Sequence, residues 1–266
     1  MNSKLSVILP VNRDDGYLDA AIDSILNQTF KDFELLIIAN NCTDELWSKI
    51  ENIKESDIRV KSFRLDLGGL TFALNYGLNI AKGEYIARMD ADDISLPQRL
   101  EKQVDFLDKN ISVVVLGTQI KYIDENNICK DILASNLPSD FNQLRKLSYF
   151  KCPIYHPTVM FRRTMILQIG GYKYGFYGED YELWLRCIHQ GYRISNLQDV
   201  LLKYRVHSSQ VSATSSNKNI YISKMLGIFQ EFYGDKWYFI GKIVQLKIFQ
   251  NIIMRTSNLR KSLFKK

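Results

Sequence analysis

Cysteine is scarce in this sequence, and the few cysteines do not form pairs. The four that occur are spread widely over the 266 residues, at Cys42, Cys129, Cys152 and Cys187. A zinc ribbon needs CxxC pairs, and a disulfide framework is typical of small chains with regularly spaced cysteines. The sequence therefore argues against both and fits a reducing compartment.

Long hydrophobic runs are also missing. The apolar run near the N-terminus, residues 5–11, is too short for the core of a signal peptide, and Asp14 and Asp15 follow it closely. No stretch reaches the roughly 20 uninterrupted apolar residues that cross a bilayer. We expect a cytoplasmic protein, either free or peripheral on the inner face of the cell membrane.

The main part of the chain has no excess of basic residues, although the net charge is +6. Residues 236–266 hold eight Lys and Arg and no Asp or Glu, which leaves 27 basic against 29 acidic residues in 1–235. A nucleic-acid-binding domain carries its basic residues on its own surface. We therefore expect no nucleic-acid partner.

What the first half does contain is an alternation of strand-like and helix-like segments. Strands are expected at 5–11, 33–39, 58–65 and 84–91, and helices between them at 17–28, 43–54 and 71–83. Gly83 is expected to stop the last of these helices. The order predicts parallel strands with crossover helices, and ligands beyond the carboxyl ends of the strands.

The second half is less regular, and no internal repeat is evident. The segments expected are a strand pair or edge strand at 112–124, a strand running into a short helix at 157–172, a helix at 179–192 and a final strand at 199–209. The chain reads as helical after Ser216.

Three aspartates, Asp90, Asp92 and Asp93, follow the fourth expected strand within four positions. On an extended chain, side chains two apart point to the same side and can share one cation. Carboxylate oxygens suit Mg²⁺ or Mn²⁺. The alternative is an N-cap for a following helix, which uses one aspartate and explains Asp93 better than the other two.

Glu179 and Asp180 stand at the start of the helix expected at 179–192. Acids there commonly complement the helix dipole, which is the interpretation favoured for Glu179. A general base is the alternative, and it stays open for Asp180. The three histidines are weak signals. His156 is typical of a loop, and His189 is typical of packing or of the surface. His207 becomes a metal ligand only if the fold brings it to the aspartates.

Together these segments resemble the family 2 glycosyltransferases with the GT-A fold. The matching blocks are SVILPVN with residues 17–44, ALNYGLNIAKGEYIARMDADD, HPTVMFRR, GGYKYGFYGEDYELWLR and YRVHSSQVS, in that order over roughly residues 4–212. The resemblance implies an α/β fold: a mostly parallel open sheet with flanking helices and a Rossmann-like nucleotide-binding half. It implies a catalytic domain at 1–215, with a nucleotide-sugar half at 1–110 and an acceptor half at 111–215, and a helical extension at 216–266.

The resemblance also implies roles for individual residues. Asp180 is expected to deprotonate the acceptor, and Asp92 is expected to hold Mn²⁺ or Mg²⁺ together with His207. The ribose would be contacted by Asp90. The remaining donor-side residues are Pro10, Val11, Asn12, Asn40, Gly69 and Ala91, and those on the acceptor side are His156, Glu179 and Trp184.

Two positions depart from the family pattern. Asn40 stands where many relatives have an aspartate that accepts from the nucleobase, and an amide can still accept and donate. Uracil therefore stays compatible with the pocket. Leu67 replaces a frequent asparagine before Gly69, which removes a polar contact near the donor.

The resulting hypothesis is an inverting, metal-dependent glycosyltransferase of the hexosyl or N-acetylhexosaminyl type. It would move a sugar from a nucleotide-sugar donor, with UDP as the expected nucleotide, to a hydroxyl of a surface-glycan or lipid-linked saccharide acceptor. One alternative is a nucleotidyltransferase acting on sugar phosphates, although the first loop lacks the Gly-rich basic sequence which that chemistry uses. Another is a non-catalytic nucleotide-sugar-binding scaffold.

The tail mixes aromatic and aliphatic residues with its eight cations. A peripheral membrane foot on anionic lipid is the interpretation favoured here, because a lipid-linked acceptor would require one. The alternative is a helix packed on the catalytic domain, since the apolar face is interrupted by Lys247 and Asn251.

Overall fold

The structure is a computed structural model. It describes residues 3–130, 134, 136–148, 151–173, 178–208, 227, 230–232 and 234. Contacts divide the chain into two units, Met1–Ala213 and Thr214–Lys266, and the sheet with its helices belongs to the first. The basic foot expected at 236–266 lies outside the described residues. The domain boundaries expected from the sequence stay predictions.

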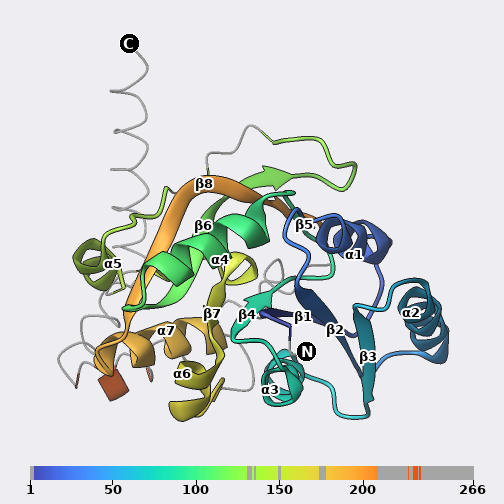
Figure 1. Ribbon diagram of the computed structural model, residues 1–266, viewed down its shortest axis with the longest axis horizontal. Helices are drawn as coiled ribbons and strands as arrows, with labels where there is room; N and C mark the ends of the chain where they lie inside the picture. Colours follow the sequence, from blue (N-terminus) through green and yellow to red (C-terminus); the bar gives the residue numbers. More distant parts are fainter. Residues whose placement is uncertain are drawn as a thin grey trace, which may run out of the picture. The chain divides into compact units, whose positions relative to one another are not determined.

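The first half folds as the alternation predicts (Figure 1). Its elements are β1 (Leu5–Val11), α1 (Leu18–Leu26), β2 (Phe33–Asn40), α2 (Asp44–Ser56), β3 (Val60–Leu65), α3 (Leu70–Ile80) and β4 (Tyr85–Arg88). The four strands are parallel and lie in the order β3-β2-β1-β4. Leu5 of β1 pairs with Phe33 on one side and with Tyr85 on the other, so these three strands begin level; β4 ends at Arg88, opposite Ile8, three residues before the end of β1.

The second half adds four strands and turns the sheet into a mixed one. Its elements are β5 (Ile94–Ser95), α4 (Arg99–Lys109), β6 (Val113–Ile123), α5 (Phe141–Leu147), the 3-10 helix η1 (His156–Thr158), β7 (Met160–Arg162), α6 (Arg163–Gln168), α7 (Glu179–His189) and β8 (Arg193–Arg205). The order continues from β4 as β7-β6-β8-β5. β7 is antiparallel to both β4 and β6, β8 is parallel to β6, and β5 is antiparallel to β8.

The segment expected as a strand pair or an edge strand is one long interior strand, β6, with neighbours on both sides. Its first eight residues are all buried. A strand covered on both faces reads as one continuous apolar run, so the sequence pattern does not distinguish it from two shorter strands.

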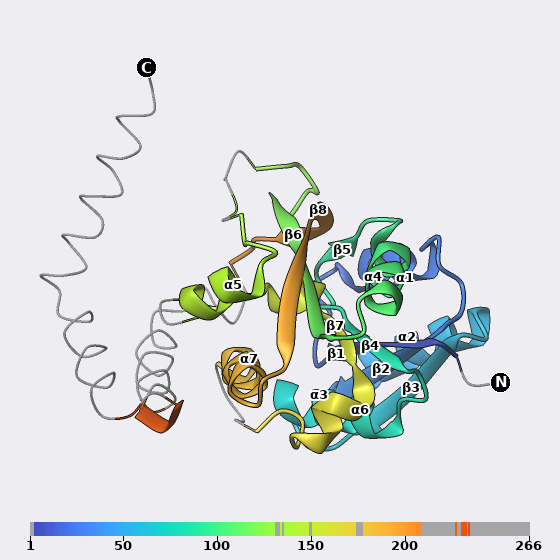
Figure 2. The same ribbon diagram turned by 60° about the vertical axis from the view of Figure 1, so that its left-hand side comes forward.

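Helices cover both faces of the sheet (Figure 2). α1, α2 and α4 pack on one face with Leu9 and Ile37, while α3, α5, α6 and α7 pack on the other with Ile8 and Ile38. Successive residues of a strand point to opposite faces, so β1 and β2 supply both cores. The arrangement confirms the predicted α/β class, an open sheet with flanking helices.

Gly83 does not end α3, which finishes three residues earlier, at Ile80. A Cβ on Gly83 would lie 2.5 Å from the backbone nitrogen of Ser6. Glycine is therefore required because the chain passes close to β1, and the predicted helix stop is wrong.

Among the described residues, no helix has the length and apolar character that crossing a membrane requires.

Candidate active site

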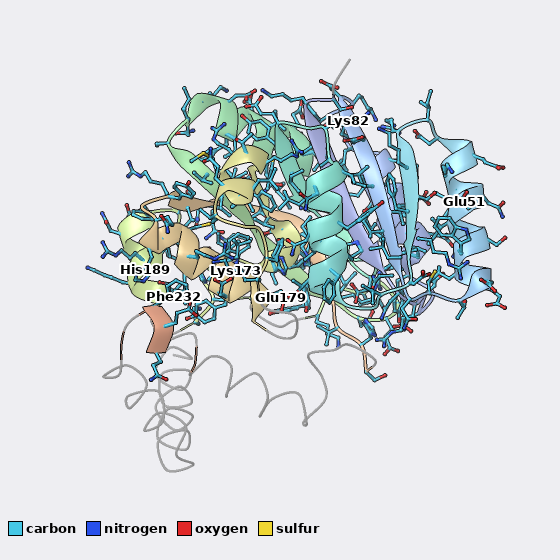
Figure 3. All side chains as sticks on the ribbon, turned by 90° about the horizontal axis from the view of Figure 1, so that it is seen from below. Glu51, Lys82, Lys173, Glu179, His189 and Phe232 are labelled. Atoms are coloured by element: carbon cyan, nitrogen blue, oxygen red, sulfur yellow. The ribbon has the colours of Figure 1, made fainter. Side chains whose placement is uncertain are left out.

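The carboxyl ends of β1, β2 and β4 carry the polar residues singled out in the sequence. Asn12 follows β1 and is exposed, whereas Pro10 and Val11 are buried inside the strand. The aspartate cluster begins two residues after β4. Figure 3 shows Lys82 near the end of the sheet where β4 starts, and Glu179 near the opposite end of the strands.

The three aspartates form one group, with a carboxylate oxygen of each within 4.8 Å of the others. The side chains of Asp90 and Asp92 are 26% and 30% exposed, whereas Asp93 is buried. Two of the three carboxylates can therefore reach a ligand.

Arg205, at the end of β8, holds this loop in place. Its backbone nitrogen donates to Oδ1 of Asp93 (2.8 Å), and its Nε donates to the carbonyl of Asp92 (2.7 Å). Asp93 does not cap α4, because Gln98 occupies the N-cap and makes no side-chain cap bond. The N-cap interpretation of the cluster is therefore wrong, and Asp93 anchors the loop to β8.

His207 lies beside the cluster. β8 ends at Arg205, four residues before the predicted end of the strand, and the chain then places Nε2 of His207 2.9 Å from Oδ2 of Asp92. The imidazole also lies 5.3 Å from the ring of Tyr17. The fold thus brings together two residues, 115 positions apart, that the resemblance assigned to one metal site.

The chemistry of this group fits a divalent cation. Burial, and then the neighbouring carboxylates, raise the pKa of Asp93, while burial raises that of Asp90 against the opposing effect of Arg88. Oδ2 of Asp93 is buried without a hydrogen-bond partner among the described residues. Several carboxylates and one imidazole form a donor set that suits Mn²⁺ or Mg²⁺.

Asn40 uses both ends of its side-chain amide within the protein. Nδ2 donates to the carbonyl of Val11 (3.1 Å), and Oδ1 accepts from the backbone nitrogen of Gly69 (2.9 Å). It therefore ties the end of β1 to the start of α3. Leu67 is 68% exposed nearby in the chain.

The residues predicted for the acceptor side gather at the start of α7, which begins at Glu179 as predicted. Burial, followed by the charge of Asp180, raises the pKa of Glu179 to about 7. Burial also raises the pKa of Asp180. The thiol of Cys152 donates to Oδ2 of Asp180 at 3.6 Å, and Asp180 remains half-buried, so its carboxylate can face a ligand.

His156 belongs to the same group. Its Nδ1 lies 3.9 Å from Oε1 of Glu179, and its Nε2 lies 2.9 Å from the hydroxyl of Tyr172. Burial, followed by the charge of Arg88, lowers the pKa of His156 well below its usual range, so the imidazole is neutral. Trp184 is fully buried and packs edge-on against the His156 ring at 6.0 Å; its predicted contact with the acceptor stays a prediction.

Sequence reasoning missed several residues of this site: Asn75, Arg88, Cys152, Tyr172 and Arg205. Only Arg88 carries a local signal, since it places a charge at the end of the apolar strand β4. The others are recognised by contacts between distant segments.

The chain is similar to known proteins in sequence and in fold. The family described as glycosyl transferase family 2 matches residues 6–170. The chain belongs to glycosyl transferase family 2. The O-antigen biosynthesis glycosyltransferase WbnJ of Escherichia coli is 45% identical over 216 residues, covering 79% of this chain and 83% of that protein.

A second relative in this family, from Escherichia coli, is a UDP-Gal:alpha-D-GlcNAc-diphosphoundecaprenol beta-1,3-galactosyltransferase. It is 34% identical over 206 residues, covering 76% of this chain and 74% of that protein.

Solved structures share the fold. S. aureus TarS 1-349 in complex with UDP-GlcNAc superposes with a TM-score of 0.68 at 20% identity, covering 85% of this chain and 65% of that one. The chain thus spans slightly less than two thirds of that structure. The mannosyltransferase PcManGT from Pyrobaculum calidifontis, in complex with GDP-Man and Mn²⁺, superposes with a TM-score of 0.66 at 15% identity. The match covers 97% of this chain and 81% of that one. The GT-A fold predicted from the sequence is confirmed.

Proposed function

We propose that this family 2 glycosyltransferase is an inverting enzyme. It transfers a hexosyl or N-acetylhexosaminyl group from a UDP-sugar to a hydroxyl of a lipid-linked saccharide, in the synthesis of a surface polysaccharide. The observation that carries the proposal is the presence of two acidic groups in the site. One is Asp92 with His207, and the other is Asp180 with Glu179. The family assignment does not favour a nucleotidyltransferase.

The donor side is assigned to the aspartate cluster and the ends of β1 and β2. Asp92 and His207 would hold Mn²⁺ or Mg²⁺, and Asp90 would contact the ribose. A divalent ion bound there supplies positive charge that stabilises the leaving diphosphate. Asn40 keeps Gly69 close to the end of β1, where the nucleoside would bind beside Asn12. The names of the relatives support a UDP-linked donor.

The acceptor side is assigned to Asp180. In this mechanism the acceptor hydroxyl gives its proton to the Asp180 carboxylate, while its oxygen bonds to the anomeric carbon on the face opposite the diphosphate. The bond between that carbon and the diphosphate oxygen breaks, and the diphosphate leaves with the electron pair. A single displacement of this kind inverts the anomeric centre, and it needs the base and the leaving group on opposite faces of the sugar.

Release of free sugar from the donor tests the catalytic proposal. Wild-type protein with UDP-sugar and Mn²⁺ should hydrolyse the donor slowly, since a transferase leaks some sugar to water, and Asp92→Ala should abolish this. Asp105→Ala, an exposed carboxylate on α4 paired with Lys109, is the matched control and should keep wild-type hydrolysis.

A second assay separates the alternatives. A wild-type protein that binds UDP-sugar but neither hydrolyses nor transfers it would be a scaffold. A panel of UDP- and GDP-sugars, measured by calorimetry, then identifies the donor; tighter binding of GDP-sugars would contradict the UDP assignment.

The basic tail at 236–266 is proposed as a peripheral contact with the anionic membrane that carries the acceptor. Cosedimentation of the full chain and of a chain ending at 235 with anionic vesicles tests this. Equal loss of both proteins from the supernatant contradicts a membrane role for the tail.

A further inference from the structure

Arg88 occupies the last position of β4, between the two halves of the site. Strand residues two apart share a face, so Arg88 lies on the same side as Ile86, which packs with α3 and α7. Its backbone nitrogen donates to the carbonyl of Val159 (2.9 Å), just after η1. Its carbonyl accepts from Nη2 of Arg99 (2.6 Å). The backbone of Arg88 is therefore held from two sides.

The guanidinium is buried and only partly paired. Its side chain is 5% exposed, and Nη2 forms an ion pair with Oδ1 of Asp90. Nε and Nη1 are buried with no hydrogen-bond partner in the described part of the chain. A buried donor without a partner destabilises the fold, and the cost is larger when the donor is charged. Such a group in a native structure calls for an explanation, and a role in catalysis is one.

The charge of Arg88 also acts on Glu179 and Asp180, the acids assigned to the acceptor side. Arg88 opposes the effect of burial on both Glu179 and Asp180, lowering the pKa of each, and it also lowers that of His156. Several elements supply groups that lie close to Asp180 or interact with it electrostatically: Arg88 on β4, Cys152 before η1, His156 on η1, Tyr172 after α6 and Glu179 on α7. Asp90 interacts electrostatically with Glu179. Among these, Arg88 is the cation.

We propose that Arg88 is a positioning residue shared by both halves of the active site. Its guanidinium holds the carboxylate of Asp90 on the donor side and supplies the positive charge that the Glu179–Asp180 pair needs on the acceptor side. This arrangement explains why Nε–H and Nη1–H are unpaired. If the guanidinium turned these groups toward Asp90 alone, its charge would move away from the Glu179–Asp180 pair, and the reverse turn would release Asp90. The inference rests on the proposed function, in which Asp180 acts as a carboxylate.

The test is the pH dependence of kcat for donor hydrolysis at saturating Mn²⁺. Arg88→Met removes the charge and should move the acidic limb of the profile to higher pH, because Asp180 and Glu179 then hold their protons more tightly. Arg88→Lys keeps the charge and should restore the wild-type limb at a reduced kcat. Arg88→Gln, which is neutral but polar, repeats the test if the methionine variant does not fold.

The matched control is Arg162→Met. Arg162 is also partly buried and donates to the carbonyls of Val113 and Leu107, but it lies at the end of β7, opposite Tyr85 at the start of β4. It should lose thermal stability and keep the wild-type pH limb. A folded Arg88→Met or Arg88→Gln protein with the wild-type limb overturns the inference, as does an equal shift in Arg162→Met. A wild-type protein with no hydrolysis and no transfer contradicts the proposed function instead.

Discussion

Asn75 holds the backbone of Tyr172 with both ends of its side-chain amide. Its Nδ2 donates to the Tyr172 carbonyl (2.7 Å), and its Oδ1 accepts from the Tyr172 nitrogen (2.9 Å). The Tyr172 hydroxyl in turn lies 2.9 Å from Nε2 of His156. A residue of α3 thereby positions a side chain that contacts His156.

Asn75→Ala should lower kcat for transfer about tenfold, because small displacements of a catalytic group are costly. The affinity for UDP should not change, since none of these contacts lies on the donor side. Steady-state kinetics and calorimetry measure the two quantities. Asn79→Ala, on the same helix, is the control and should leave both unchanged; a loss of UDP affinity in Asn75→Ala would falsify the assignment of Tyr172 to the acceptor side.

His207→Ala should weaken Mn²⁺-dependent binding of UDP by about 10- to 100-fold, the usual cost of losing a group that supports a metal site. The reason is the 2.9 Å contact between His207 and Asp92. Calorimetry with UDP, with and without Mn²⁺, separates metal-dependent from metal-independent binding. His189→Ala, at the end of α7, is the control. Equal weakening without Mn²⁺ would show that His207 contacts the nucleotide rather than the ion.

Asp180→Asn should lower kcat by about 10²–10⁴-fold, the range for loss of a general base. Donor affinity should be kept, because the base acts on the acceptor. A stopped assay of transfer and a UDP titration measure the two. If affinity and turnover fell together, Asp180 would belong to the donor side.

The pH profile of the wild-type enzyme should show an acidic limb set by the Glu179–Asp180 pair. Burial raises the pKa of both acids, that of Glu179 to about 7, so activity is present above the limb and lost as the pH falls and Asp180 takes up a proton. Asp180→Asn removes the charge that, after burial, raises the pKa of Glu179, so that pKa should fall. NMR titration of the Glu179 carboxyl measures it, and an unchanged pKa would exclude coupling between the two acids.

Gly83→Ala should destabilise the folded chain by about 3 kcal/mol, at the upper end of the usual cost of overpacking. The added methyl would lie 2.5 Å from the Ser6 nitrogen, and backbone atoms have little freedom to move. Gly191→Ala is the control: its φ is +79° and a Cβ there meets no atom of the described chain within 4 Å, so it should cost about 1 kcal/mol for backbone conformation alone. Denaturant unfolding of the two variants gives the comparison, and equal losses would contradict the steric explanation.

The sequence alone determined the elements whose signals are local. Hydrophobic runs and helical periodicity identified β1 to β4 with their helices, and the parallel order placed Asp90 and Asp92 at the carboxyl edge of the sheet. The acidic start of α7, at Glu179 and Asp180, was also visible, because a helix start has its own local chemistry. Five ordered motifs then indicated the family.

The tertiary structure decided everything that depends on contacts between distant segments. It paired His207 with Asp92, set Asn75 against Tyr172, and used Asp93 to anchor the loop to Arg205 rather than to cap α4. Periodicity reports only whether a residue faces a core, whereas these partners depend on strand register and on packing across the sheet.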